Sequence, residues 1–94
     1  MKISDVTTEF ARDYCGVSDT DENVRIAPCM AAAKAFILGH TGLDEAAADT
    51  HEDLTVAYLI LINEFYTNRD YTVEKAEKNP CVTQLLALHS VNYL

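Results

Sequence analysis

One segment of the chain, residues 50–69 (THEDLTVAYLILINEFYTNR), is apolar on nearly every side between Leu54 and Tyr66. Its helical periodicity gives one apolar stripe, and further apolar residues cover much of the opposite side. The stripe consists of Leu54, Ala57, Tyr58, Leu61 and Phe65, and the opposite side carries Val56, Leu59, Ile60 and Ile62. Thr50, with Asp53 three residues later, is a weaker relative of the capping box that opens helices. The segment therefore predicts a helix at the centre of the fold, with its surfaces covered by protein.

The length of the chain limits how much core it can form. Its 94 residues predict a single domain, residues 1–94, in which 49% of the residues are hydrophobic and only three are Gly and two Pro. This composition favours a compact globule over a disordered chain. A chain of this size buries only about 60 to 65% of the surface that its unfolded form exposes. Contacts with partner chains would therefore add to its stability.

The chain is acidic, with 15 Asp and Glu against 7 Lys and Arg and a formal net charge of -8. Tight binding to nucleic acids requires clusters of Lys and Arg that neutralise phosphates, and this sequence has no such cluster. We therefore expect no tight or sequence-specific binding of DNA. An acidic surface suits a protein that stands beside DNA without holding it, since like charges repel.

Neither a secretion signal nor a membrane anchor is expected. The N-terminal sequence MKISDVTTEF lacks the apolar core of a signal peptide, and no segment reaches the roughly 20 apolar residues that span a bilayer. The sequence therefore predicts a cytosolic protein without membrane association. Cys15, Cys29 and Cys81 are an odd number at wide spacing, which favours reduced thiols over a disulfide framework. Buried free cysteine is the expected environment of all three.

Two helices are predicted before the central one. Thr7 or Thr8 caps a short helix over residues 9–14, and Gly16 ends it in the left-handed conformation. An alanine-rich helix is predicted from about residue 21 to residue 38, closed by Gly39 and Gly42. Val24, Ala27, Ala31 and Leu38 fall near one face of this helix. Residues 31–33 and Ala35 supply small side chains that permit the close approach of another helix.

Pro28 lies inside the alanine-rich segment, where it removes one backbone hydrogen bond. Either the helix is kinked there, or it begins near Ala27 with Pro28 in its first turn. We favour the kinked helix.

The rest of the chain contributes connectors and one more helix. A helical turn at residues 43–48 is one alternative for the connector before the central helix, and residues 70–78 are expected to form a loop. Asn79 caps a last helix that begins at Pro80 and runs to about His89. The expected fold is therefore all-α, a compact bundle of about four helices: a short N-terminal helix, an alanine-rich helix, a long central apolar helix and a C-terminal helix.

The chemistry-bearing residues do not form a recognisable site. Asp19, Asp21 and Asn23 match the opening of a calcium-binding loop, but Val24 stands where glycine is needed and Met30 where glutamate is needed. The cysteines and histidines lack the short spacings of zinc sites. Serine never directly follows aspartate, as it does in acyl carriers, because Ser4-Asp5 and Ser18-Asp19 are in the reverse order, and phosphate-binding glycine loops are absent. We therefore predict no catalytic, cofactor-binding or metal-ligating residue, and no enzyme.

Two groups of residues are candidates for protein interaction. Tyr66, Arg69 and Tyr71 form an aromatic and arginine cluster at the end of the central helix, of the kind enriched at interfaces. The alternative for this cluster is an ordinary helix C-terminus that favours Arg, with its aromatic residues in the core. An apolar tail, suited to docking, is formed by Val91, Tyr93 and Leu94.

Two motifs, together with the order of the helical segments, resemble a known family. The motifs are A-A-K-A-F-I-x-x-x-T-G at residues 32–42 and E-F-Y-x-N-R at residues 64–69, followed by the segment NPCVTQLLALHSV. This ordered set, which covers nearly the whole chain, resembles the small all-helical head-to-tail connector proteins of tailed bacteriophages. These proteins are also called adaptor or head-completion proteins.

The resemblance implies a non-enzymatic virion protein that assembles into a homo-oligomeric ring, dodecameric in characterised relatives. Such a ring docks on the portal at the capsid vertex, extends the DNA channel and offers a platform for the stopper or tail-completion protein. DNA passes through the channel without sequence-specific binding. The implied location is the head–tail junction of the virion, with assembly in the host cytoplasm.

Two other classes of function are alternatives to the connector. A small cytosolic adaptor would bind one protein partner without forming a ring, and the same apolar helix and tail would serve it. An enzyme or metal protein is disfavoured by the missing ligand spacings. A central helix with surplus apolar surface favours a subunit that completes its burial against neighbouring chains.

Overall fold

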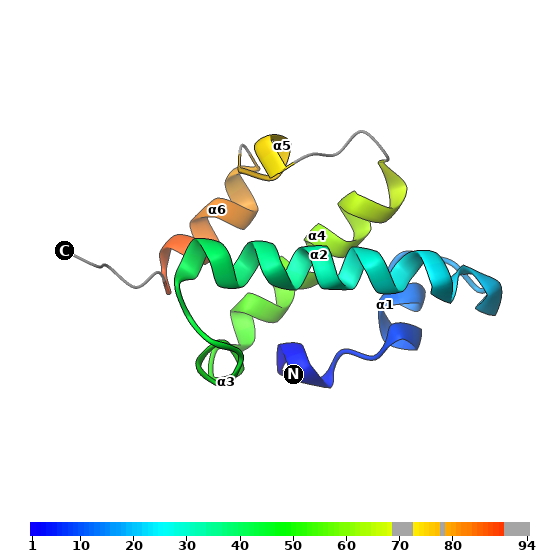
Figure 1. Cartoon of the computed structure of the whole chain (residues 1–94), viewed down its shortest axis with the longest axis horizontal. Coiled ribbons are helices and arrows are strands. Elements are labelled where there is room, and N and C mark those ends of the chain that lie inside the picture. The colour runs from blue at the N-terminus through cyan, green and yellow to red at the C-terminus, as the bar shows by residue number, and fades with distance from the viewer. Residues whose placement is uncertain (69–72, 78, 90–94) are drawn as a thin grey trace.

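Helix α4 (Glu52–Thr67) packs against α2 (Asn23–Thr41), the longest helix among the described residues, in an all-α fold (Figure 1). The computed structural model describes residues 1–68, 73–77 and 79–89. Within these residues, α1 (Thr8–Tyr14) and α6 (Pro80–Ala87) complete the set of helices with at least seven residues, and there is no strand. The shorter elements are η1 (Ile3–Asp5), η2 (Thr20–Glu22), α3 (Glu45–Ala48) and α5 (Val73–Glu77). The predicted all-α bundle of about four helices is therefore confirmed.

The central position of α4 is also confirmed, because its predicted apolar stripe is buried except for the partly buried Phe65. Leu54, Ala57 and Leu61 are fully buried, and Tyr58 is 2% exposed. The opposite side is covered less completely: Ile62 is fully buried, but Val56 remains 51% exposed. Helices α1, α2 and α6 all pack on α4, and each occupies part of its circumference. The surplus apolar surface expected from the sequence is thus concentrated on one side of the helix.

The predicted capping of α4 by Thr50 is wrong. The Thr50 hydroxyl donates to the Ala47 carbonyl at 2.7 Å, so it closes the turn of α3 instead. His51 occupies the N-cap position of α4 without a side-chain cap hydrogen bond. Glu52 and Asp53 supply negative charge to the first turn, where the helix dipole favours it.

The alanine-rich helix α2 is longer than predicted at its C-terminal end. It begins at Asn23, passes through Gly39 and ends at Thr41. Gly42 adopts a φ of 74°, and its N–H donates to the Leu38 carbonyl at 3.0 Å. Gly42 therefore closes α2 as predicted, but the prediction that Gly39 also ends the helix is wrong, since a single glycine costs only about 1 kcal/mol inside a helix.

The packing face predicted for α2 is wrong, because the helix buries a bulkier stripe. Ile26, Ala33 and Ile37 are fully buried. Val24 is 78% exposed, and Ala27 and Ala31 are exposed as well. Branched side chains bury more apolar area than alanine, and the burial of that area dominates helix docking. Of the small residues, Ala33 is buried in this stripe, whereas Ala27, Ala31 and Ala35 are turned outward.

Pro28 lies inside α2, so the alternative of a helix that begins near Ala27 is wrong. Figure 1 shows α2 as one continuous helix along the length of the molecule. Pro28 has no N–H to donate to the carbonyl of Val24. Because Val24 and Pro28 both lie on the exposed side, that carbonyl is turned toward solvent rather than toward the core.

The two smaller predicted helices begin at the predicted caps. Thr7 Oγ1 accepts a hydrogen bond from the Phe10 N–H at 3.0 Å at the start of α1, which Gly16 follows with a φ of 76°. Asn79 Oδ1 accepts from the N–H groups of Cys81 and Val82 at the start of α6. These caps are confirmed, as is the helical turn before α4, which is α3.

The loop predicted at residues 70–78 is wrong in its described part. Residues 73–77 form the short helix α5, whose Ala76 is fully buried. His40 Nε2 of α2 lies 3.5 Å from Glu77 Oε1 of α5. A helix this short has little stability of its own, so its contacts with α2 and α6 stabilise it.

Candidate functional site

The first candidate surface is an apolar groove between α4 and α6, called here the α4–α6 groove. Val82 and Leu86 of α6 point inward and are buried, which leaves Leu88, just after the helix, 72% exposed. Leu88 and the half-exposed Val56 of α4 stand at an open hollow of about 580 Å³. The groove is lined by Val56, Pro80, Cys81, Gln84, Leu85 and Leu88.

The α4–α6 groove carries no formal charge. None of its lining residues is Asp, Glu, Lys or Arg, and residues 80–94 contain none of these four residue types. The charged residues of this acidic chain thus all precede Pro80. This absence of charge is the signal in the sequence for the groove, whereas the interaction residues predicted for this region are Val91, Tyr93 and Leu94.

The second candidate surface is a hollow beside α2, called here the α2 hollow, with a volume of about 500 Å³. The small side chains of α2 leave this space open, and Tyr58 of α4 also lines it. Lys34 Nζ lies 3.8 Å from Glu45 Oε1 within the hollow. The lining consists of Thr8, Ala27, Met30, Ala31, Lys34, Ala35, Leu38, Glu45 and Tyr58.

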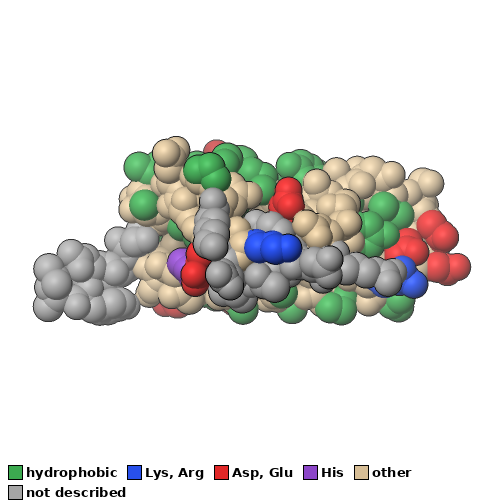
Figure 2. All heavy atoms as spheres, turned by 90° about the horizontal axis from the view of Figure 1, so that it is seen from above, with side chains coloured by type: hydrophobic (Ala, Val, Ile, Leu, Met, Phe, Trp, Pro, Cys, Tyr) green, Lys and Arg blue, Asp and Glu red, His purple; other side chains and the backbone are tan. Residues whose placement is uncertain are grey.

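Acidic side chains are unevenly distributed over the face seen in Figure 2, where they gather at the end formed by η2 and the start of α2. The α4–α6 groove has no acidic lining residue, whereas Glu45 lines the α2 hollow. An acidic chain that meets another acidic surface experiences the least repulsion at an uncharged site such as the groove.

Tyr66, the described member of the predicted interaction cluster, has an intramolecular partner. Its hydroxyl donates to Glu22 Oε2 at 2.9 Å, and Glu22 also lies 3.7 Å from Arg25 Nε. Burial of the phenol, together with the hydrogen bond to Glu22, raises the pKa of Tyr66. The bond joins the end of α4 to the start of α2. The structure therefore gives Tyr66 a structural function, beside an open hollow of about 300 Å³ that it lines with Arg25, Cys29 and Phe65.

The remaining predicted interaction residues lie outside the described part of the chain. These are Arg69, Tyr71, Val91, Tyr93 and Leu94. Their assignment as interaction residues stays a prediction. Leu88 of the groove lies three residues before Val91, where the predicted apolar tail begins. The predicted tail and the groove residue Leu88 are therefore close together in the sequence.

A histidine and aspartate cluster fastens the end of α6 to the start of α4. His89 Nε2 donates to Asp53, with its nitrogen 2.6 Å from Oδ2 and 2.8 Å from Oδ1. The His51 and His89 rings stack with their centroids 3.9 Å apart. The hydrogen bond from His89 holds the pKa of Asp53 below its ordinary value. The cluster joins the residues just after α6 to the first turn of α4, so it fixes the position of α6 against α4. The shape of the α4–α6 groove depends on that position.

We predict that Asp53 makes stability depend on acid pH. Because its pKa is lowered in the folded state, its stabilising effect is complete above the unfolded value of 3.8 and is lost as the pH falls through the lower folded value. Asp53→Asn should therefore flatten the acid side of the stability profile, as measured by urea unfolding at a series of pH values. His89→Asn should produce the same flattening. A wild-type acid profile in both variants would contradict this assignment.

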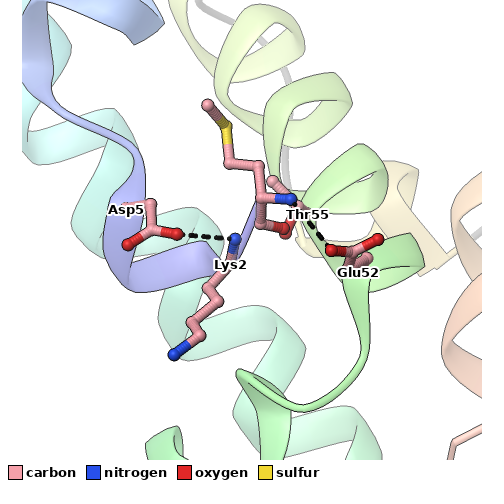
Figure 3. A network of polar contacts seen from close by, with 5 residues as sticks. Lys2, Asp5, Glu52 and Thr55 are labelled. Carbon is pink, nitrogen blue, oxygen red and sulfur yellow. Dashed lines mark hydrogen bonds and ion pairs between the residues drawn. The ribbon is translucent and has the colours of Figure 1, made fainter.

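The N-terminal residues are hydrogen-bonded to α4 (Figure 3) and, through Asp49, to the end of α3. The Met1 amino group lies 3.3 Å from Glu52 Oε1, and the Thr55 hydroxyl donates to the Met1 carbonyl at 2.7 Å. The Ser4 N–H donates to Asp49 Oδ1, and hydrogen bonding to Ser4 lowers the pKa of Asp49. These contacts bring Ile3, which is 4% exposed, into the core.

The three cysteines are free thiols in two different environments. Cys15 and Cys29 are partly buried, and burial raises the pKa of both thiols. Cys81 is exposed in the α4–α6 groove, so the expectation of a buried thiol is wrong for this residue. The error follows from α6, whose inward face is occupied by Val82 and Leu86 instead.

The described residues include no group of three or more His, Cys, Asp or Glu side chains placed to hold a metal ion. Across the same part of the chain, no helix combines the length and apolar character needed to cross a membrane.

Comparison with known proteins adds no relative. No family model, curated protein or solved structure matches this chain. The two apolar surfaces are accordingly the features from which a function can be argued.

Proposed function

We propose that this protein is a head-to-tail connector subunit of a tailed bacteriophage, which assembles into a ring on the portal and links the capsid to the stopper or tail. The observation that carries the proposal is the presence of several open apolar surfaces among the described residues, which include the α4–α6 groove and the α2 hollow. A ring subunit needs two such surfaces, one for each neighbour. The order of motifs along the chain supports the same function.

The residues of those motifs contribute to the fold in ways that suit a rigid subunit. Phe36, Ile37 and Thr41 of the first motif are buried, and Gly42 provides the left-handed cap of α2. Thr41 donates to the Ile37 carbonyl at 2.8 Å and accepts from the Leu43 N–H at 3.2 Å. The motif thus defines how α2 ends, and it keeps the adjacent α2 hollow in a fixed shape.

The charge of the protein is compatible with a channel for DNA. The chain has a net charge of -8, and an acidic channel wall repels phosphate and lets DNA slide. The proposed function is structural and assigns no catalytic group. DNA would pass without sequence-specific contact.

The test is assembly with a portal protein. We expect purified protein, mixed with the portal encoded beside it, to add a ring that negative-stain images show below the portal and that light scattering detects as added mass. A protein that never joins a portal would contradict the proposal. Genes for capsid, portal and tail proteins around its own gene would distinguish a connector from a single-partner cytosolic adaptor.

A further inference from the structure

We propose that the α2 hollow binds a neutral, largely apolar small molecule whose carbonyl oxygen accepts a hydrogen bond from the Tyr58 hydroxyl. This binding site does not depend on the connector function, because its ligand is held by a single chain. The α4–α6 groove and the apolar hollow beside Phe36 and His40 remain open for assembly. Three features of the α2 hollow support the site: an unpartnered hydroxyl, the size and walls of the hollow, and the charge around it.

The Tyr58 hydroxyl is a hydrogen-bond donor without an acceptor in the chain. Tyr58 belongs to the buried stripe of α4 and is only 2% exposed. Among the described residues, no group exchanges a hydrogen bond with its hydroxyl. Burial raises the pKa of Tyr58 above its ordinary value, so the phenol stays protonated at neutral pH and can donate. Nearly all buried polar groups in proteins have a partner, so this hydroxyl is suited to one from outside the chain.

The Tyr58 hydroxyl opens onto the α2 hollow. Within the described part of the chain, Arg12 Nε is the polar side-chain atom that is both unpartnered and completely enclosed. The Tyr58 hydroxyl is unpartnered but not enclosed in this way, so the small exposed part of Tyr58 includes its oxygen. Since Tyr58 lines the α2 hollow, this is the space that its hydroxyl reaches. The aromatic ring is packed in the core, which fixes the direction of the donor.

The α2 hollow has the size and the walls of a small-molecule site. Its volume of about 500 Å³ lies within the roughly 300 to 1,000 Å³ of typical ligand pockets. Alanine side chains of α2, together with Met30 and Leu38, form apolar walls. Ligand pockets combine such walls with a few polar groups that fix the orientation of the ligand. Tyr58 supplies a group of this kind.

The charges around the α2 hollow favour a neutral ligand. The two charged residues of the lining offset each other, since Lys34 Nζ lies 3.8 Å from Glu45 Oε1. The net charge of -8 on the chain disfavours an anion. A carbonyl oxygen accepts a hydrogen bond from Tyr58 and brings no N–H or O–H that the apolar walls would leave unpaired. The chemical class of the ligand is therefore an apolar ketone or ester.

The test compares acetophenone, a ketone, with ethylbenzene, which has a similar shape but no oxygen. Amide chemical shifts, recorded by NMR during a titration, give the dissociation constant and locate the site. We expect acetophenone to bind in the millimolar range and to shift amide signals of residues 27–38. Tyr58→Phe keeps the aromatic ring and breaks no hydrogen bond among the described residues, so the variant should fold, which circular dichroism checks. It should weaken acetophenone binding roughly three- to tenfold and leave the affinity for ethylbenzene unchanged.

A second pair of variants tests the space itself. Ala31 and Ala32 are neighbouring exposed residues of α2, but Ala31 lines the α2 hollow and Ala32 lines the other one. Ala31→Leu should abolish acetophenone binding, because the larger side chain fills the hollow. Ala32→Leu, the matched control, should leave the dissociation constant at its wild-type value. Leucine is a good helix former, so both variants should fold.

Other results would overturn the inference without deciding the proposed function. Absence of acetophenone binding, or shifts confined to another part of the protein, would show that the α2 hollow takes no such ligand. If Tyr58→Phe weakens binding of both compounds equally, or of neither, the hydroxyl does not recognise the carbonyl. Wild-type multimers in light scattering that Ala31→Leu abolishes would identify a second copy as the occupant. In each case, binding to the portal still tests the connector function separately.

Discussion

Leu61→Asp should abolish cooperative folding of this protein. Leu61 is fully buried near the middle of α4, in contact with a core that α1, α2 and α6 share. Loss of its apolar side chain alone would cost about 2 to 5 kcal/mol, and a buried carboxylate without a partner costs several kcal/mol more. A domain of this size has a total stability of roughly 5 to 15 kcal/mol. The substitution therefore removes most or all of it.

The control for Leu61→Asp is Val56→Asp, on the same helix. Both changes place aspartate in α4, so the difference in helix propensity and net charge is the same within a few tenths of a kcal/mol. Val56 is 51% exposed, so its aspartate remains solvated and should cost less than about 1 kcal/mol. Far-UV circular dichroism and urea unfolding measure both variants. A Leu61→Asp protein with the wild-type midpoint would show that α4 is not central to stability.

Local features of the fold could be predicted from the sequence because they depend on neighbouring residues. The caps at Thr7 and Asn79 and the left-handed Gly16 and Gly42 are each defined within one turn of helix. The buried stripe of α4 follows from strong periodicity over many residues. These features needed no knowledge of the tertiary structure.

The predictions that failed depended on contacts between distant elements. Helix α2 has apolar residues on both sides, and only its docking on α4 selects the Ile26 and Ile37 side over the alanine side. Likewise, the exposure of Cys81, which was predicted to be buried, depends on the orientation of α6 against α4. Periodicity identifies candidate faces of a helix, but packing decides which one is buried.

Pro28→Ala should stabilise the protein. Pro28 lies inside α2 on an exposed side, so replacing it removes no core contact and restores the N–H that the Val24 carbonyl lacks. The gain of about 3 kcal/mol for removing an interior proline is reduced by about 0.4 to 1 kcal/mol, because alanine makes the unfolded chain more flexible. The net effect of about 2 kcal/mol corresponds to a rise in melting temperature of roughly 8 to 16 °C for a domain of this size.

Pro80→Ala is the matched control, because Pro80 is the first residue of α6 and is also exposed. At that position the missing N–H has no partner within the helix, and the fixed φ of proline favours helix initiation. Its replacement should therefore leave the melting temperature unchanged or lower it by a few degrees, as calorimetry or circular dichroism can measure. Opposite signs for the same chemical change would show that the position within the helix, rather than proline content, determines stability. Equal shifts in both variants would mean that Pro28 causes no strain in α2, and that the helix adapts to it through its exposed backbone.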